Sequence, residues 1–345
     1  MKIIRYIYKN SINIGLIINK NSVINIQDLK IKMDNTIDFI DFLNNKNFQP
    51  QKKYNEKKLL KLNQVRLLSP IEKPNSLRDA YAFKKHVEAG RKGRGLPMIK
   101  EFDSFPVYYY SNHSAINGPG DIHFHKNHFD RLDFELELAI IIAKEGENIK
   151  VEDADDYIFG FMIMNDWSAR SIQKEEMKLN LGPAKGKDFA TSFGPYIITK
   201  DKLKSKRIET EFGYKYDLNM SAFINNKKVS EDNSKNMHWT FAQIVSHIST
   251  GTTLYPGDVI GSGTCATGCL LEINLTNKTD KWLKLNDIVT LKIEGLGELK
   301  NKIEHVIRNI DSIRQDSLQL SKFAINRYSW GKMAPVYDKQ FNLIR

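Results

Sequence analysis

Apolar residues along this chain recur most often at every second position, which is the period of a half-buried β-strand. The chain begins with two short segments of this kind, 2–8 and 12–18, joined by a polar turn. Alternating or continuous apolar runs bounded by turn residues predict further strands. These predicted strands are 65–68, 135–142, 157–164, 195–199, 218–224, 259–262, 269–275 and 288–293.

Two segments have the period of an amphipathic helix instead. Apolar residues three or four positions apart share one face in 36–43 and again in 240–248, where Gly251 follows as a stop signal. Strands outnumber helices, and the two do not alternate regularly. The pattern therefore predicts a mixed α+β fold rich in β-structure, and it argues against a doubly wound parallel sheet.

One domain boundary is predicted in the first quarter of the chain. A polar, lysine-rich stretch at 44–61 is followed by a short apolar run that Ser69-Pro70 stops, and then by Pro74. Such a change of composition is typical of a boundary between domains. We therefore predict a small N-terminal domain over 1–73 and a larger domain over 74–345.

Composition and charge narrow the possible partners. The chain has 345 residues, of which 41% are hydrophobic and 27% charged, as in ordinary soluble proteins. Its net charge of +11 is spread along the sequence, without a basic stripe interleaved with aromatic residues. We therefore expect no nucleic-acid partner, and the charge is better suited to attracting small anions.

The cysteines and the apolar runs bear on the compartment. Cys265 and Cys269 form no C-x-x-C motif, which predicts packing residues in a reducing compartment. The apolar residues near the N-terminus are interrupted by Arg5 and Lys9, unlike a signal peptide. The sequence has no run of about 18 apolar residues, so no membrane span is predicted. These features predict a cytoplasmic protein with no membrane partner.

Glu135 and Glu137 lie in the predicted strand 135–142, where alternation places both carboxylates on one face. The apolar continuation of this strand leads into a core. Two like charges beside a core are driven toward protonation unless a strong positive partner is present. A divalent cation is one such partner, and an all-oxygen site favours a hard ion such as Mg²⁺ or Ca²⁺. Two solvated glutamates on an edge strand are the simpler alternative.

A second candidate group follows the predicted strand 157–164. Asp166 is in the position of a residue that opens a helix, where an aspartate caps the first amides. Arg170 and Gln173 come four and seven residues later, so all three are predicted near one helix face. Taken alone, an N-cap and two solvated side chains would also explain them.

Two more fragments carry residues with possible chemistry. Asp79, Tyr81 and His86 are closely spaced, and a histidine is the usual general base at neutral pH. Lys187 lies in a segment rich in glycine and proline, which predicts a loop. A lysine there can neutralise an anion, although most loop lysines are simply solvated.

Taken together and in this order, these fragments resemble the fumarylacetoacetate hydrolase family. The resemblance covers roughly 79–297 and is closest to the bacterial and archaeal branch, whose members handle varied 2-oxo acids. It implies a mixed β-roll catalytic domain and a homodimer. The matching blocks are Asp79/Tyr81/His86, Glu135-Leu136-Glu137, 164–170, 186–189, 256–264 and 268–272.

The resemblance also implies a role for each residue. One divalent cation per subunit, Mg²⁺ or Ca²⁺ with Mn²⁺ as a third candidate, would be bound by a set of four carboxylates. His86 would activate water, and Glu272 would orient its imidazole. Arg170, Gln173 and Lys187 would bind substrate oxygens and stabilise the departing carbanion. The implied metal ligands are Asp79, Glu135, Glu137 and Asp166; the implied substrate contacts are Tyr81, Tyr109 and Thr264, with Thr191 supporting the site from behind.

The implied reaction is hydrolysis of a carbon–carbon bond in a small anionic β-diketone or 2-oxo acid. A cation chelated by a 1,3-dicarbonyl polarises the attacked carbonyl and stabilises the enolate that leaves. Fumarylacetoacetate is the first candidate substrate, with fumarate and acetoacetate as products, a step of aromatic amino-acid catabolism. The alternatives are hydrolysis of an acylpyruvate, decarboxylation of oxaloacetate, and isomerisation or dehydration of a 2-oxo or sugar acid. A binding protein without catalysis is a further alternative.

Three departures from the family pattern leave the substrate open. Met177 stands four residues after Gln173, where members acting on fumarylacetoacetate tend to have a tyrosine that binds substrate. The loop before Lys187 is one residue longer, and the N-terminal part is shorter than in the animal enzymes.

A histidine-rich segment offers an alternative metal site. His123, His125 and His128 form an H-x-H-x-x-H pattern that can bind zinc. The segment is predicted as a polar loop, whereas the metal chemistry of the family relies on carboxylates.

Overall fold

Strands outnumber helices among the described residues, which confirms the predicted mixed α+β, β-rich class. The computed structural model describes residues 1–46, 48, 54–305, 321, 325, 329, 331–335 and 337. The elements that build the site belong to one unit, formed by Met1–Ile122 and Asn127–Glu304. His123–Lys126 and the described residues from His305 onward belong to a second unit.

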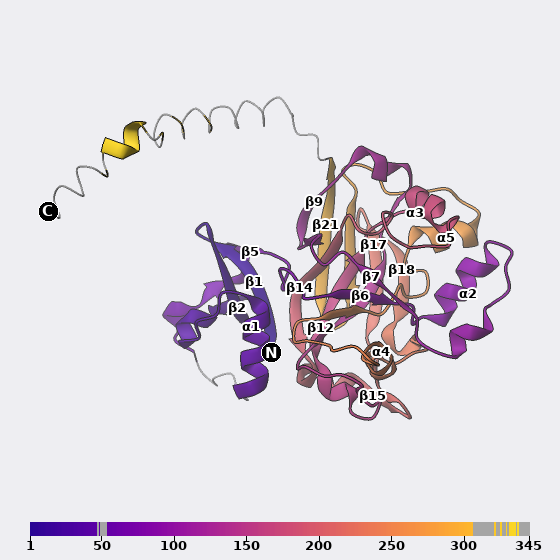
Figure 1. Cartoon of the computed structure of the whole chain (residues 1–345), viewed down its shortest axis with the longest axis horizontal. Helices are drawn as coiled ribbons and strands as arrows, with labels where there is room; N and C mark the ends of the chain where they lie inside the picture. Colours follow the sequence, from indigo (N-terminus) through magenta and orange to yellow (C-terminus); the bar gives the residue numbers. More distant parts are fainter. Residues whose placement is uncertain are drawn as a thin grey trace. The chain divides into compact units, whose positions relative to one another are not determined.

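The elements of the described residues are labelled in Figure 1 where space allows. The strands are β1 (Lys2–Tyr8), β2 (Ser11–Asn19), β3 (Ser22–Asn25), β4 (Leu60–Lys61), β5 (Arg66–Leu67), β6 (Leu77–Ala80), β7 (Tyr108–Ser111), β8 (Ile116–Asn117), β9 (Gly120–Phe124), β10 (Leu132–Asp133), β11 (Leu136–Ile142), β12 (Ile158–Asp166), β13 (Ser168–Ala169), β14 (Thr191–Thr199), β15 (Arg207–Thr210), β16 (Gly213–Tyr216), β17 (Asn219–Ile224), β18 (Lys227–Asn233), β19 (Val259–Gly261), β20 (Ile288–Ile293) and β21 (Gly297–His305). The α-helices are α1 (Thr36–Lys46), α2 (Lys84–Lys92), α3 (Arg170–Met177), α4 (Phe241–Ile248) and α5 (Leu270–Asn277). The short 3₁₀ helices are η1 (Ile26–Leu29), η2 (Glu56–Lys58), η3 (Leu62–Gln64), η4 (Lys100–Asp103), η5 (Lys126–Arg131), η6 (Ala154–Tyr157), η7 (Lys200–Lys206) and η8 (Ser234–Asn236).

The largest sheet has the strand order β4-β3-β2-β1-β14-β12-β11-β19-β6-β7, with β5 beside β1 and β8 beside β14. In its middle, β11 pairs antiparallel with β12 and with β19, and β19 pairs parallel with β6. Every residue of β11, β12 and β14 is buried. Burial on both faces explains why these strands have continuous apolar runs where a half-exposed strand would alternate.

The N-terminal strands extend this sheet. β1 and β2 form a hairpin whose turn residues, Lys9 and Asn10, have positive φ (47° and 61°), as tight two-residue turns require. β1 also pairs with β14. From α1, Phe39 and Leu43 join a hydrophobic cluster that also contains Met164 of β12. The domain boundary after residue 73 stays a prediction.

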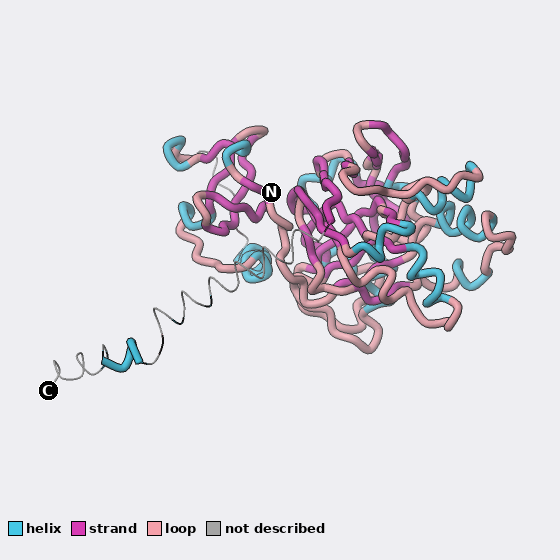
Figure 2. Tube along the Cα trace, turned by 90° about the horizontal axis from the view of Figure 1, so that it is seen from above, coloured by secondary structure: helices cyan, strands magenta, loops and turns pink. Residues whose placement is uncertain are grey.

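A second sheet contains β18, β17, β20 and β21 in this order. The predicted helix 240–248 is confirmed as α4, and Thr240 caps it by accepting a hydrogen bond from the Gln243 amide. In the right-hand part of Figure 2 the strands (magenta) lie close together, and most of the helices (cyan) lie toward the right-hand edge. None of the described helices has the length and apolar character needed to cross a membrane.

The predicted strand 269–275 is wrong, because this segment forms helix α5. Leu271, Ile273 and Leu275 alternate with polar residues, which imitates a strand in the sequence. In the helix the buried residues are instead Leu270, Glu272 and Asn274. Hydrogen bonds from elsewhere in the fold decide the outcome. The amides of Leu270 and Leu271 donate to the carboxylate of Asp133, far away in the sequence, and thus fix the first turn of the helix.

The predicted helix start at Asp166 is also wrong. Asp166 is the last residue of β12 and pairs with Thr191 of β14. The helix begins at Arg170, and its N-cap residue, Ala169, makes no side-chain capping bond. The Asp166 carboxylate is not available for capping, because Lys187 and Tyr109 donate hydrogen bonds to it.

Most other predicted strands differ from the structure only at their ends, and β1 and β20 coincide with their predictions. β6 was missed, since its sequence Leu-Arg-Asp-Ala has two charged residues that are nevertheless buried. The segment 123–128 is not simply a polar loop, because His123 lies in β9 and His128 in η5. Both cysteines are buried and unpaired, in agreement with a packing role.

We expect Ile140→Ala to lower the free energy of unfolding by about 2–5 kcal/mol, the usual cost of such a truncation in a core. Ile140 is fully buried in β11 and lies opposite Phe161 and Ile260 on the two neighbouring strands. Ile12→Ala is the matched control, because Ile12 is 57% exposed and its loss should change the free energy by less than about 0.5 kcal/mol. Urea denaturation measures both, and equal effects would contradict the placement of β11.

Candidate active site

Four carboxylates from neighbouring strands converge at one place. Asp79 belongs to β6, Glu137 to β11 and Asp166 to β12, while Glu135 directly precedes β11. One ligand atom from each lies within 4.8 Å of the ligand atoms of the others. The predicted pairing of the two glutamates is thus found in the fold, and Asp79 and Asp166 join them.

A glycine allows this approach. β19 lies between β11 and β6, so its side chains would separate Glu137 from Asp79. At this level β19 has Gly261, where an added Cβ would lie 2.4 Å from Asp79 Oδ1 and 2.9 Å from Glu137 Oε2. The absence of a side chain at residue 261 therefore brings the two carboxylates together.

Burial makes the cluster electrostatically costly. All four carboxylates are buried. Burial raises the pKa of Asp79 to about 7, and the nearby Asp166 adds to the shift. Burial, with Asp79 and Glu135 next, raises the pKa of Glu137 well above its usual value. The pKa of Asp166 is also raised by burial, although Lys187 opposes the change.

Glu135 is held in its charged form. Burial by itself would raise its pKa, but Lys187 and Arg170 outweigh burial and bring the pKa below its usual value. Lys187 Nζ donates to Glu135 and, over 2.8 Å, to Asp166. Burial alone would lower the pKa of Lys187, but Asp166 and Glu135 raise it above its ordinary value, so the ammonium stays charged.

Neutral donors complete part of the cluster. The amide of Gly263 donates to Asp79 Oδ1 over 3.0 Å and to Glu137 Oε2 over 3.1 Å. The Tyr109 hydroxyl donates to Asp79 over 2.9 Å and also to Asp166. Tyr109 thus lies against the carboxylates, and its predicted contact with substrate stays a prediction.

Two carboxylate oxygens of this cluster have no hydrogen-bond partner among the residues that the structure describes. These atoms are Glu137 Oε1 and Asp166 Oδ1, and both are buried. A buried carboxylate oxygen without a partner is costly. The donor set consists of oxygens only, which suits a hard divalent cation such as Mg²⁺ or Ca²⁺. The residues of the cluster therefore fit such an ion.

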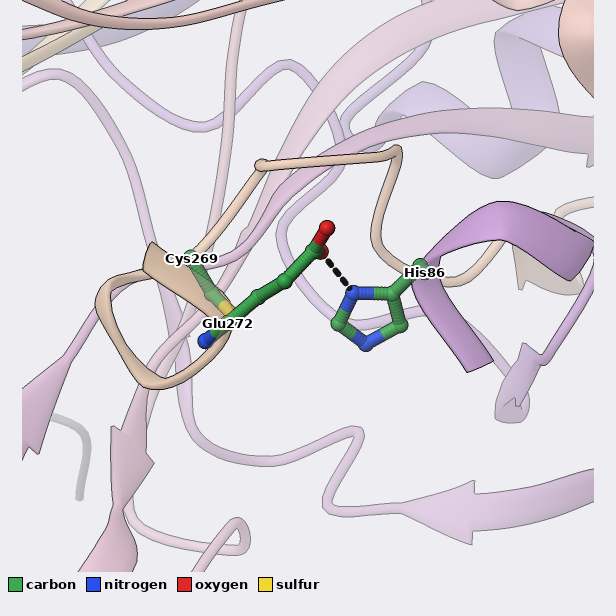
Figure 3. Close-up of side chains that lie close together, drawn as sticks. All are labelled: His86, Cys269 and Glu272. Carbon is green, nitrogen blue, oxygen red and sulfur yellow. Dashed lines mark hydrogen bonds and ion pairs between the residues drawn. The ribbon is translucent and has the colours of Figure 1, made fainter. Parts of the chain in front are cut away.

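His86 and Glu272 form a second group beside the carboxylates. They come from α2 and α5, which lie side by side (Figure 1). His86 Nδ1 is 2.6 Å from Glu272 Oε2 (Figure 3). Cys269, the N-cap of α5, accepts a hydrogen bond from the Glu272 amide over 3.5 Å. His86 also contributes, after Lys187 and Arg170, to lowering the pKa of Glu135.

Arg170 and Gln173 share a face of α3, as predicted, since Arg170 Nη1 donates to Gln173 Oε1 over 2.9 Å. The same guanidinium donates to Glu135 Oε1 over 2.7 Å. Its third nitrogen, Nε, donates to Asp133 over 2.8 Å. Arg170 therefore lies directly beside the carboxylate cluster.

The remaining predicted residues lie around this centre. The ring of Tyr81 meets that of His86 edge to face, with 5.9 Å between centroids. Thr264 is buried next to Gly263, whose amide binds two of the carboxylates. Thr191 pairs with Asp166 along the β12–β14 ladder. Met177, at the end of α3, is 47% exposed.

Two cavities accompany these residues. One of about 280 Å³ is lined by Lys187 together with residues of β7 and of the loop after α3. A larger one, of about 870 Å³, is lined by N-terminal residues and by η7, and none of the four carboxylates borders it. Lys187 therefore borders the smaller cavity and also donates to Glu135 and Asp166 of the cluster.

The roles of Asp133, Gly261 and Gly263 in the site were not predicted from the sequence. The alternation that identified Glu135 and Glu137 also includes Asp133, two residues earlier, and extending the pattern would have found it. The two glycines act through a missing side chain and a backbone amide, for which residue chemistry gives no signal.

In metal-free protein the cluster should become a source of instability as the pH rises. An aspartate whose pKa is raised on folding binds more protons in the native state than in the unfolded state. The free energy of unfolding therefore falls as the pH rises from the pKa of the unfolded state, near 4, through the pKa of Asp79 in the folded state, about 7. With EDTA, we expect Asp79→Asn to raise Tm relative to wild type more at pH 8 than at pH 5. Thermal scans test this, and a gain that is larger at pH 5 would contradict the charge repulsion.

We expect Gly261→Ala to weaken binding of Mn²⁺ by about 10–100-fold, the usual effect of disturbing the groups that hold metal ligands in place. The added Cβ would displace Asp79 or Glu137. Gly90→Ala is the control, because a Cβ at Gly90 meets nothing within 4 Å. Isothermal titration with Mn²⁺ measures the change, and equal affinities in the two variants would refute it.

Comparison with known proteins assigns the family. The sequence model described as "Fumarylacetoacetate (FAA) hydrolase C-terminal" matches residues 76–304. Fumarylacetoacetase of Oryza sativa subsp. japonica is 32% identical over 258 residues, which are 60% of this chain and 60% of that protein. Oxaloacetate tautomerase YisK of Bacillus subtilis strain 168 is 28% identical over 248 residues, 70% of this chain and 74% of that protein.

The structure is similar to fumarylacetoacetate hydrolase EaFAH of Exiguobacterium antarcticum, with a TM-score of 0.68 and 27% identity over 88% of this chain and 99% of that one. This agreement confirms the mixed β-roll fold. The chain spans only 41–60% of the length of three plant and animal fumarylacetoacetases that it matches. Closeness to the bacterial and archaeal branch stays a prediction. Because the family's sequence model matches well over half of its residues, the chain belongs to the fumarylacetoacetate hydrolase family.

Proposed function

We propose that this protein is a metal-dependent enzyme that hydrolyses a carbon–carbon bond in a small anionic β-diketone or 2-oxo acid. The observation that carries the proposal is the pairing of His86 with Glu272 beside a buried cluster of four carboxylates. The pair offers a base for water, and the cluster offers a place for a cation.

The base is built from the hydrogen bond between His86 and Glu272. A carboxylate accepts, so His86 Nδ1 carries the hydrogen and donates it to Glu272 Oε2. This tautomer leaves Nε2 unprotonated and able to take a proton from water. A general base of this kind contributes about 10²–10⁴-fold to the rate.

Asp79, Glu135, Glu137 and Asp166 would hold one divalent cation, Mg²⁺ or Ca²⁺, with Mn²⁺ as a third candidate. When bound, such an ion polarises a carbonyl oxygen that it chelates. The all-oxygen donor set and the two unpartnered oxygens support this assignment. Thr191 holds Asp166 from the neighbouring strand.

Arg170, Gln173 and Lys187 would bind the oxygens of the substrate. Arg170 donates to Gln173, and Arg170 and Lys187 keep their positive charge in the buried site. Tyr81, Tyr109 and Thr264 are assigned to further substrate contacts. Preorganised donors at a developing negative charge stabilise the transition state strongly.

His86, Arg170 and Lys187 can supply the proton transfers and the positive charge that the proposed hydrolysis needs. His86 removes a proton from water, whose oxygen forms a bond to the attacked carbonyl carbon. The carbon–carbon bond then breaks, and its electron pair leaves with the enolate carbon. That carbon takes up a proton, which His86 can return. Arg170 and Lys187 counter the charge on oxygen throughout.

Fumarylacetoacetate is our first candidate substrate, with fumarate and acetoacetate as products, a step of aromatic amino-acid catabolism. The likeness to the rice fumarylacetoacetase supports this choice. Met177 weighs against it, because the family's substrate-binding tyrosine is missing there. Acylpyruvates are the next candidates. The net charge of +11 favours anionic substrates in either case.

We further propose a cytoplasmic homodimer.

Keto–enol isomerisation of a 2-oxo acid is the second candidate function. The tautomerase of Bacillus subtilis supports it, because the match covers more of both proteins than the match to the rice enzyme does. The same base and cationic donors could move a proton between carbon and oxygen without breaking a carbon–carbon bond. Hydrolysis is favoured because the His86–Glu272 pair is suited to activating water.

The test follows the diketone absorbance of fumarylacetoacetate in the presence of purified protein, with Mg²⁺ and with EDTA. We expect rapid loss that requires the metal, and a rate about 10²–10⁴-fold lower for His86→Ala. His247→Ala is the matched control, because His247 is an exposed residue of α4 and should leave the rate unchanged.

Product analysis separates the two candidate functions. Hydrolysis gives two fragments, whereas isomerisation leaves the mass of the substrate unchanged. No loss of absorbance with fumarylacetoacetate, acylpyruvates and oxaloacetate would overturn the proposed hydrolysis. Conversion of oxaloacetate between keto and enol forms without fragments would favour the second candidate.

A further inference from the structure

Asp133 is a fully buried carboxylate that the proposed function does not use. It ends the short strand β10, where it pairs with Ser168 of β13, two residues before Arg170. Asp133 therefore lies close to the beginning of α3. It is not one of the four clustered carboxylates, and its oxygens point to other partners.

One set of partners belongs to Arg170. Asp133 Oδ2 accepts from Arg170 Nε over 2.8 Å, while the other end of the guanidinium reaches Glu135 and Gln173. Three different acceptors therefore define the plane of the guanidinium. Glu135 is an expected metal ligand, so Asp133 is the carboxylate that can hold Arg170 regardless of what binds at the cluster.

The other set of partners belongs to α5. The amides of Leu270 and Leu271 donate to Asp133 over 2.7 and 3.0 Å. The next amide, that of Glu272, donates to Cys269 Sγ. A carboxylate is favoured at the positive end of a helix. Asp133 thus fastens the first turn of α5, the turn from which Glu272 reaches His86 over 2.6 Å.

We propose that Asp133 is a positioning residue that locks the substrate-binding Arg170 and the base-orienting helix α5 into one arrangement. This inference rests on the proposed function, since it assigns a purpose to Arg170 and Glu272. Asp133 touches neither the expected cation nor substrate. It acts by holding two groups in place: Arg170, which would donate to the oxygens of the substrate, and Glu272, which would orient the base His86.

Asp133→Asn tests the need for two accepting oxygens. Asparagine has the same shape, but one of its oxygens becomes an amide nitrogen that donates. That nitrogen would face either Arg170 Nε and the Leu271 amide, at the place of Oδ2, or the Leu270 and Phe134 amides, at the place of Oδ1. Either way donor meets donor. We expect kcat to fall by at least about 10²-fold, as when an oxyanion donor is lost. Asp130→Asn is the control, because exposed Asp130 contacts α3 through Ser171, outside the site.

A double-mutant cycle separates positioning from a merely structural role. Because Asp133 acts through both Arg170 and α5, Asp133→Asn should lower kcat less in an Arg170→Ala background than in wild type. In an Arg170→Ala/Glu272→Ala background it should lower kcat by no more than about 3-fold, since both groups that it positions are then absent. Losses in kcat that multiply in this double background would overturn the proposal, as would an Asp133→Asn enzyme within 3-fold of wild type. If Asp133→Asn fails to fold, Asp133→Ser replaces it, since a hydroxyl still accepts from an amide but gives Arg170 no charge.

A readout without turnover distinguishes this proposal from the proposed function. In full-length protein labelled with ¹⁵N-arginine, the buried Nε–H of Arg170 should give a slowly exchanging NMR signal, which Arg170→Lys identifies by its loss. We expect that signal to be lost or to exchange rapidly in Asp133→Asn and to persist in Asp130→Asn. If no substrate is turned over but the signal behaves as expected, the function fails and the positioning role stands. An unchanged signal in Asp133→Asn overturns the positioning role.

Discussion

Mutual repulsion among four buried carboxylates is the constraint on which the rest of the site depends. Their ligand atoms lie within 4.8 Å of one another. At an effective dielectric constant of about 20, two unit charges at that separation repel by about 3 kcal/mol. Lys187 is shared by Glu135 and Asp166, and Arg170 is divided between Glu135 and Asp133. The cluster keeps an excess of negative charge, which protons or a divalent cation must balance.

The fold holds the four carboxylates in place through contacts between segments that are far apart in the sequence. Strands of the large sheet bring the carboxylates together, and Gly261 leaves them the space to meet. From the cluster a continuous chain of hydrogen bonds runs through Arg170 and Asp133 to the first turn of α5, and from Glu272 to His86. The carboxylate cluster and the His86–Glu272 pair are therefore parts of one connected structure.

The apolar pattern predicted the β-rich class, most strands and helix α4, and the motif blocks brought together most of the candidate site. The predictions failed where contacts between distant segments decide the structure. The segment 269–275 is helical because Asp133 binds its first amides, and Asp166 ends a strand because Thr191 pairs with it. β6 escaped notice because Asp79 looks like a surface residue until the partners that bury it are known. Local sequence contains no information on such partners.

The most direct test of the account is a crystal structure of the protein soaked with Mn²⁺, with an anomalous difference map recorded for the metal. We predict one peak per chain among Asp79, Glu135, Glu137 and Asp166, with carboxylate oxygens about 2.0–2.6 Å from it. Lys187 should have moved away from Glu135 or Asp166 to admit the ion. A map with no peak at these carboxylates, or with its peak at His86 and Cys269 instead, would contradict the claim that a divalent cation balances the cluster.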